Sequence, residues 1–110
     1  MRTGILAGAA LGLALAACKP SGGDDPVELG RRAFAANCTA CHNPDPSKPG
    51  TIGPAIAGSP PELVRARVLR AEYPPGYKPK RESHAMPPMP QLADEIDDLT
   101  AYLNECCPSR

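Results

Sequence analysis

The chain has 110 residues, a formal net charge of zero, one Phe, three Tyr and no Trp. This length allows one small domain, which buries a small fraction of its surface and is expected to need a covalent or similar staple. The neutral charge excludes a chain-wide electrostatic footprint for nucleic acid, so we expect no nucleic-acid partner. Fifteen prolines and ten glycines indicate that much of the fold lies in turns.

Residues 1–17 have the pattern of an export signal. One positive charge, Arg2, precedes an uncharged apolar stretch that runs from Gly4 to Ala17. The stretch is shorter than the roughly 20 residues of a transmembrane helix, and its length suits the apolar core of a signal peptide. It ends in Leu15-Ala16-Ala17-Cys18, which resembles the lipobox at which bacterial lipoprotein signals are cut.

The lipobox resemblance implies that Cys18 becomes the N-terminal residue and carries lipid. Each CH₂ buried in a bilayer adds about 0.8 kcal/mol of affinity, so several acyl chains would anchor the protein to the membrane. Residues 18–25 then form the lipidated Cys and a flexible tether rich in Gly, Ser and Pro. The alternatives are an ordinary secretory signal and an uncleaved anchor. All three export the domain, which we expect on the periplasmic side, at the inner or outer membrane.

Residues 25–28 (DPVE) predict the start of the first helix. Asp25 is the expected N-cap, and Glu28 would complete a capping box. Phe34 lies on the apolar face of this helix. Gly30 lies on the same helix, where a Gly costs about 1 kcal/mol relative to Ala. Either the helix simply tolerates this Gly or, as we expect, another segment approaches the helix closely at this point.

The first helix leads into Cys38-Thr39-Ala40-Cys41-His42, the C-x-x-C-H spacing at which a c-type haem is attached. Cys38 and Cys41 can each add to one vinyl group of the same porphyrin, and His42 then becomes the proximal axial ligand of the iron. A haem-free thiol–disulfide motif would need a βαβ context, and no strand signal flanks these residues. The motif predicts one covalent haem c.

Residues 43–58 contain four prolines and three glycines, which predict a loop. Within it, Gly53-Pro54 follows His42 by eleven and twelve positions. A ligand imidazole needs a hydrogen-bond acceptor for its other ring N–H, and the Pro54 carbonyl is a plausible one. Without the haem motif, this dipeptide would indicate only a turn.

Residues 59–62 (SPPE) predict the start of a second helix with another capping box. The loop that follows, residues 73–83, carries basic side chains that can bond haem propionates, face an acidic partner or simply remain solvated. Residues 65–81 contain six basic residues and one acid, whereas the last predicted helix is acidic. The neutral molecule is therefore expected to be dipolar, which can orient an encounter with a charged partner.

Residues 83–90 (SHAMPPMP) contain three candidates for the sixth iron ligand. Met86 precedes two prolines that hold the chain extended, and a Met thioether favours ferrous iron. We assign the second axial position to Met86 and keep Met89, which otherwise would fill a gap at the haem edge, as the second candidate. His84 is the third candidate, and its default interpretation is a solvated loop histidine.

The last predicted helix spans Leu92 to Asn104, with an apolar residue at every third or fourth position. Cys106 and Cys107 open a tail, residues 106–110. Adjacent cysteines rarely bond each other. We therefore expect a disordered tail, with free thiols, pairing between chains or metal binding as alternatives.

In this order, the segments resemble the class I c-type cytochromes over essentially all of residues 26–105. The resemblance implies an all-α, small cytochrome c fold, with about three main helices and long loops wrapped round one covalent haem, and with the first and last helices crossing near Gly30. It implies these roles: thioethers at Cys38 and Cys41, axial ligands at His42 and Met86, and a Pro54 carbonyl that accepts from His42. Met89 stands where the family usually has a Phe, which leaves a second Met close to the iron.

The function predicted from this resemblance is electron transfer between membrane-associated respiratory proteins, with no enzymatic activity. The expected partners are redox proteins, and the expected contact with the membrane is the lipid anchor. The rival hypothesis is a haem enzyme or gas-binding sensor, peroxidase-like, with an open or labile sixth site. It would need a distal base, for which His84 is the histidine candidate, and Met86 argues against it.

Overall fold

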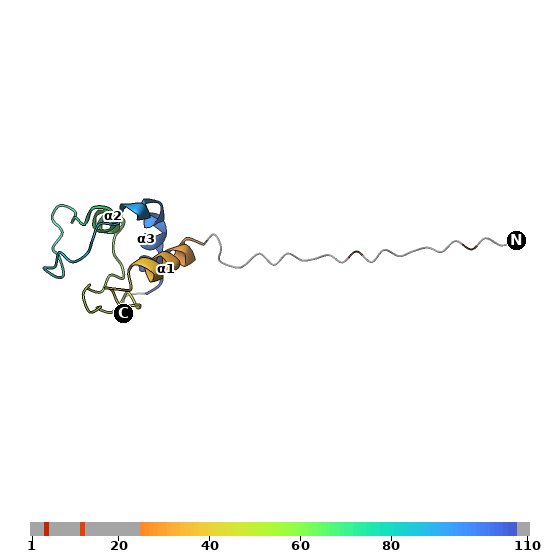
Figure 1. Ribbon diagram of the computed structural model, residues 1–110, viewed down its shortest axis with the longest axis horizontal. Helices are drawn as coiled ribbons and strands as arrows, with labels where there is room; N and C mark the ends of the chain where they lie inside the picture. The colour runs from red at the N-terminus through yellow and green to blue at the C-terminus, as the bar shows by residue number, and fades with distance from the viewer. Residues whose placement is uncertain (1–3, 5–11, 13–24, 108–110) are drawn as a thin grey trace.

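The structure is a computed structural model that describes residues 25–107 together with Gly4 and Gly12. Its elements are helix α1 (Pro26–Asn37), helix α2 (Pro61–Arg70), the 3-10 helix η1 (Pro90–Glu95) and helix α3 (Ile96–Glu105) (Figure 1). Residues 25–107 contain no strand, so the all-α prediction is confirmed. The rest of the predicted signal peptide, Cys18, most of the tether and the last three residues lie outside the described part of the chain.

Within that part of the chain, no helix has the length and apolar character needed to cross a membrane.

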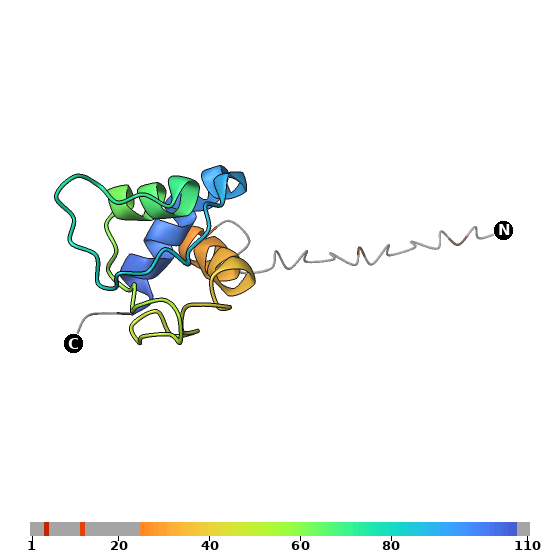
Figure 2. The same ribbon diagram turned by 60° about the vertical axis from the view of Figure 1, so that its left-hand side comes forward.

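Helices α1 and α3 cross in direct contact, and this crossing organises the domain (Figure 2). Gly30 is buried at the crossing point. A Cβ added there would overlap the Asp98 carbonyl and lie 2.8 Å from Cβ of Tyr102. The close approach predicted from Gly30 is therefore present, and its partner is the backbone of α3.

The hydrophobic core lies between α1 and α3 and is closed by α2 and η1. Phe34 of α1 is 2% exposed, and its ring centroid lies 5.5 Å from that of Tyr102 in α3. The core cluster consists of Ala33, Phe34, Val64, Val68, Leu92, Ile96, Leu99 and Leu103. All four helical elements contribute to it, so their apolar faces meet in one core.

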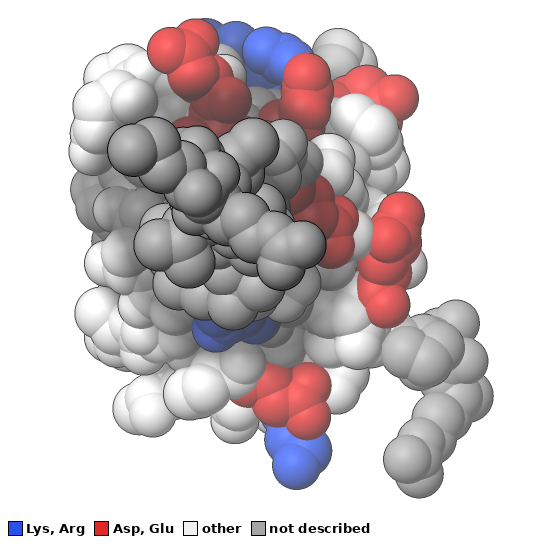
Figure 3. Space-filling model, turned by 90° about the vertical axis from the view of Figure 1, so that its right-hand side faces the viewer, with Lys and Arg blue, Asp and Glu red and all other residues white. Residues whose placement is uncertain are grey.

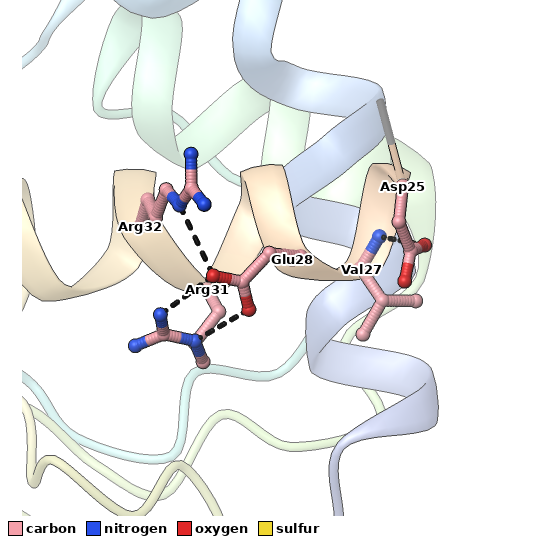
Figure 4. Close-up of polar contacts among 5 residues, drawn as sticks. All are labelled: Asp25, Val27, Glu28, Arg31 and Arg32. Atoms are coloured by element: carbon pink, nitrogen blue, oxygen red, sulfur yellow. Dashed lines mark hydrogen bonds and ion pairs between the residues drawn. The ribbon is translucent and has the colours of Figure 1, made fainter. Parts of the chain in front are cut away.

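Helix α1 begins as the sequence predicts, but without the expected capping box. The carboxylate of Asp25 accepts a hydrogen bond from the Val27 N–H at 3.1 Å (Figure 4). Glu28 turns along the helix instead of back to the cap, and accepts hydrogen bonds from Arg31 and Arg32. The Arg31 guanidinium lowers the pKa of Glu28 to about 2.

The capping box expected at residues 59–62 is also absent. Pro60 is the N-cap of α2 and has no side-chain acceptor to offer. The Ser59 hydroxyl donates instead to the Ile56 carbonyl at 2.6 Å. Because Pro61 at the first helical position has no N–H, the helix start has one fewer donor to satisfy.

The last predicted helix is divided in two. Its first residues form the 3-10 helix η1, and regular α-helix begins only at Ile96. The N-cap of η1 is Met89, and the N-cap of α3 is Glu95. No side-chain cap hydrogen bond is formed by either residue. The missing cap explains why the α-helical pattern starts four residues later than predicted.

The Cys106–Cys107 pair corrects another expectation, because the two residues are joined by a disulfide. Cys106 keeps helical backbone angles as the C-cap of α3, and its N–H donates to the Tyr102 carbonyl at 2.8 Å. Cys106 is therefore an ordered part of the helix end, although the sequence predicted a disordered tail from this residue onward.

Charge is distributed unevenly over the domain. Most charged side chains on the face shown in Figure 3 are acidic. Helices η1 and α3 carry Asp94, Glu95, Asp97, Asp98 and Glu105. The basic loop 73–83 projects at the other end of the domain, on the left in Figure 1. Arg65, which lies in α2 outside this loop, forms an ion pair with Asp97 of α3 at 3.6 Å.

The crossing at Gly30 gives a prediction in which packing opposes helix propensity. At an open helix position, Gly→Ala stabilises a protein by about 1 kcal/mol. Gly30→Ala should instead destabilise this domain by about 1–3 kcal/mol, because its Cβ forces α1 away from α3. The measurement is the free energy of unfolding in urea.

The matched control is Ala35→Gly, on the exposed side of α1. It should lose about 1 kcal/mol through propensity alone. A stabilised Gly30→Ala variant would contradict the close approach of the two backbones.

Candidate haem-binding site

The C-x-x-C-H segment prolongs α1 by one turn, and this sets the spacing of its side chains. The Cys38 N–H donates to the Phe34 carbonyl at 2.9 Å, and the His42 N–H donates to the Cys38 carbonyl at 2.9 Å. Both bonds have the i→i−4 pattern of an α-helix. The buried Phe34 therefore fixes the position of Cys38, and Cys38 fixes that of His42.

His42 is oriented by the loop that follows it. Its Nδ1 lies 3.0 Å from the Pro54 carbonyl oxygen, the contact expected from the sequence. A carbonyl can only accept, so the proton of the neutral ring must be on Nδ1. Nε2 then keeps its lone pair, which is the form in which an imidazole binds a metal.

Gly53 allows the loop to lie directly against the imidazole. A Cβ at this position would come within 2.5 Å of His42 Nδ1. The Gly53 N–H donates to the Cys41 carbonyl at 2.9 Å, so the loop is also fixed to the C-x-x-C-H backbone. The Gly-Pro pair thus has two distinct roles: Gly53 gives room for the ring, and Pro54 supplies its acceptor.

The two thiols, His42 and both candidate methionines line one open cavity of about 280 Å³. Its walls are largely apolar and come mainly from α2 and the two long loops, with Leu103 from α3. The apolar residues include Ile52, Ile56, Leu63, Val64, Val68 and Leu103. Two thiols, a neutral imidazole and a thioether around an apolar cavity are the donor set and surroundings that a haem c requires. These residues therefore fit the predicted group.

The thiols of Cys38 and Cys41 are both free. Burial, and secondarily the neighbouring Cys41, raises the pKa of Cys38 to about 11. Cys38 is thus a protonated thiol at neutral pH, in a partly apolar setting at the end of α1.

The three candidates for the sixth ligand differ in their surroundings. Met86 and Met89 are both half-buried, line the cavity and pack against the core. The Met89 N–H donates to the Val68 carbonyl at 2.6 Å, which attaches this segment to α2. His84 is exposed and is not among the cavity-lining residues of the described chain. The assignment of Met86 over Met89 stays a prediction.

Two basic residues have a role that the sequence did not indicate. The Arg81 guanidinium donates to the carbonyls of Gly50, at 3.2 Å, and Ile52, at 2.8 Å. Lys80 donates to the Ala55 carbonyl at 2.8 Å. Backbone carbonyls have no sequence signature, so these contacts could not be predicted. They join the loop that carries Met86 to the loop that orients His42.

Aromatic residues form the wall next to these contacts. The rings of Tyr73 and Tyr77 are stacked with centroids 5.5 Å apart, and the Arg67 guanidinium lies 4.1 Å from the Tyr73 ring centroid. All three residues line the cavity. A cation is attracted to the face of an aromatic ring, so Arg67 helps to attach α2 to the loop that carries the two tyrosines.

Comparison with known proteins identifies the family. The family model described as cytochrome c matches residues 27–106. The chain belongs to the cytochrome c family. A cytochrome c domain implies a covalently attached haem c and haem-based electron transfer, and members of this family are typically electron carriers rather than enzymes. Neither curated protein sequences nor solved structures gave a match.

The Arg81 contacts predict that this residue braces the His42 loop. Arg81→Ala should raise the amide hydrogen-exchange rates of residues 50–53, because two carbonyls lose their charged donor. It should also lower the free energy of unfolding by about 1 kcal/mol, as expected for hydrogen bonds at a partly exposed site. Exchange followed by mass spectrometry measures the first effect.

Lys78→Ala is the matched control, since Lys78 lies exposed in the same loop and the described structure gives it no hydrogen bond. It should leave exchange in residues 50–53 unchanged. Equal behaviour of the two variants would show that Arg81 does not brace the loop.

Proposed function

We propose that this cytochrome c family protein carries one electron at a time between membrane-associated respiratory partners, through a single haem c with His42 and Met86 as axial ligands. The observation that carries the proposal is one cavity that brings together two thiols, a histidine oriented by the Pro54 carbonyl and a thioether. The thioethers would form at Cys38 and Cys41, and Met89 is the second candidate for the sixth position.

When bound, the haem supplies a one-electron ferric/ferrous couple. The chain's own residues prepare the site for it. The Pro54 carbonyl accepts a hydrogen bond from Nδ1 of His42, so Nε2 is the ring nitrogen that would ligate. The apolar wall residues would lower the dielectric around a bound haem, which disfavours the more highly charged form of the couple. A soft thioether as the second ligand would favour the reduced state.

The family and the position of the second histidine support a carrier rather than a histidine-assisted haem enzyme. His84, the one histidine besides His42, is exposed outside the cavity, so no second histidine faces the site. The uneven charge supports a partner that approaches in a preferred orientation. An uncovered basic end can steer the domain toward an acidic redox protein.

We further propose that the protein is exported and held on the periplasmic side of a membrane by lipid on Cys18. The support is the apolar leader that ends in Leu15-Ala16-Ala17-Cys18, followed by a short polar tether. Confinement at the bilayer would raise the effective concentration of the domain at membrane-bound partners.

The sixth ligand is tested with two substitutions of the same chemistry. Met86→Ala should abolish the weak long-wavelength absorption band of Met-ligated ferric haem and lower the reduction potential. Met89→Ala should keep the band, because Met89 would only pack at the edge of the haem. The measurements are visible spectra and a potentiometric titration of each purified holoprotein.

The same spectra test the rival function. A six-coordinate, low-spin ferric spectrum in the unmodified protein is expected for the carrier. High-spin ferric haem that binds carbon monoxide readily after reduction would instead support an enzyme or gas sensor with an open sixth site. If Met86→Ala keeps the band and Met89→Ala loses it, the ligand assignment is wrong but the carrier function stands.

Lipid attachment has its own test, independent of the haem. Cys18→Ser should move the protein from the detergent phase to the aqueous phase in a detergent partition, because the acyl chains supply the membrane affinity. The haem spectrum should not change. Retention of the variant in the detergent phase would indicate an uncleaved anchor, and an aqueous unmodified protein would indicate an ordinary secretory signal.

A further inference from the structure

The disulfide between Cys106 and Cys107 is distinct from the haem site. The two residues follow α3 directly, and both are half-buried. Neither lines the cavity that holds Cys38 and Cys41. They lie on a second open cavity, whose lining also includes the side chains of Asp45, Ser47, Tyr102 and Asn104.

This disulfide contributes little to the stability of the fold. A disulfide stabilises a protein mainly by closing a loop in the unfolded chain, and the effect falls as the loop becomes shorter. Cys106 and Cys107 are adjacent in sequence, so their bond closes no intervening chain. The hydrophobic core also contains neither residue, and α3 is attached to the rest of the domain by other contacts.

Those other contacts lie just before the cysteine pair. The Gly58 N–H donates to the Leu103 carbonyl at 2.8 Å, and the Asn104 side chain donates to the Ser59 carbonyl at 2.9 Å. They connect the end of α3 to the loop without any contribution from sulfur. Opening the disulfide therefore removes no contact on which the core or the loop depends.

We propose that Cys106–Cys107 is a redox-active site that exchanges two electrons with thiols. A bond that contributes little stability yet lies on an open cavity is accessible to a thiolate and can open while the domain stays folded. The substrate class is a small thiol or a protein dithiol. The proposal does not depend on the haem or on its ligands.

The reaction follows ordinary thiol–disulfide exchange. A substrate thiolate attacks one of the two sulfurs, the Cys106–Cys107 bond breaks, and a mixed disulfide forms with release of one cysteine thiolate, which takes up a proton. A second substrate thiol resolves the mixed disulfide. Its sulfur bonds to that of the first, and the other cysteine leaves with a proton. Two substrate thiols are oxidised to one disulfide, and the protein gains two electrons and two protons as two thiols.

The test uses the full-length protein, equilibrated without denaturant in mixtures of reduced and oxidised glutathione and then alkylated. Peptide mapping by mass spectrometry locates the alkyl groups, so thiols at Cys18, Cys38 or Cys41 are counted separately. We expect no alkylation of Cys106 and Cys107 in the oxidised protein. As the reduced fraction rises, two groups should appear together, and the urea midpoint should stay the same in both forms.

Two controls make the outcome decisive. The double variant Cys106→Ser, Cys107→Ser should gain no alkyl group in the C-terminal peptide and should unfold at the same urea concentration as the unmodified protein. Free thiols in the oxidised protein, or a disulfide between two chains, would overturn the proposal. It would equally be overturned if reduction required denaturant, or if reduction lowered the urea midpoint, since the bond would then be structural. The haem spectrum reports separately on the electron-carrier proposal.

Discussion

The direct contact between the backbones of α1 and α3 at Gly30 is the constraint on which the rest of the domain depends. With no side chain between them, the helices approach until the α3 carbonyl of Asp98 lies where a Cβ would be. Phe34 and Tyr102 then fill the space beside the crossing. Because the C-x-x-C-H segment prolongs α1, the crossing also decides where the two thiols and His42 lie relative to α3.

Backbone carbonyls, and a glycine that leaves room for a ring, position the ligand side chains of the candidate site. Pro54 acts through its carbonyl, and Gly53 acts by having no Cβ. Arg81 acts on two further carbonyls of the same loop. A small domain with a single Phe has few large side chains with which to shape a cavity. Its glycines and prolines do so instead, by fixing where the loop backbone passes.

The parts of the fold that could be predicted were those that depend on residues close together in the sequence. Helix periodicity predicted the three main helical segments, and Gly30 predicted a close approach, since an apolar repeat and the cost of a Gly in a helix can both be recognised within one element. The capping boxes at Glu28 and Glu62 were wrong because side-chain caps compete with other partners. Glu28 has two arginines within reach on its own helix, and the prolines before Glu62 displace Ser59 from the cap.

The candidate site shows the same division. The spacing from His42 to Pro54 predicted their contact, because the haem motif requires an acceptor for the ring N–H. The contacts of Lys80 and Arg81 connect segments at least 25 residues apart and end on carbonyls, which every residue has. Nothing in the sequence distinguishes such an acceptor from its neighbours. The positive charge of the loop was evident from the sequence, but the carbonyls that its side chains contact could be identified only from the structure.

The two cysteine pairs show that the effect of a covalent link on stability depends on which parts of the chain it joins. At Cys38 and Cys41, a covalent haem would cross-link the end of α1 to a plate on which both loops pack, so its removal would affect the whole cavity. At Cys106 and Cys107, the bond encloses nothing, and the helix above it is held by α1 and by backbone contacts to residues 58 and 59. Its oxidation state is therefore decoupled from the stability of the fold. Its oxidation state can then follow that of the surrounding thiols, whereas a disulfide that stabilises the fold is harder to reduce in the folded protein.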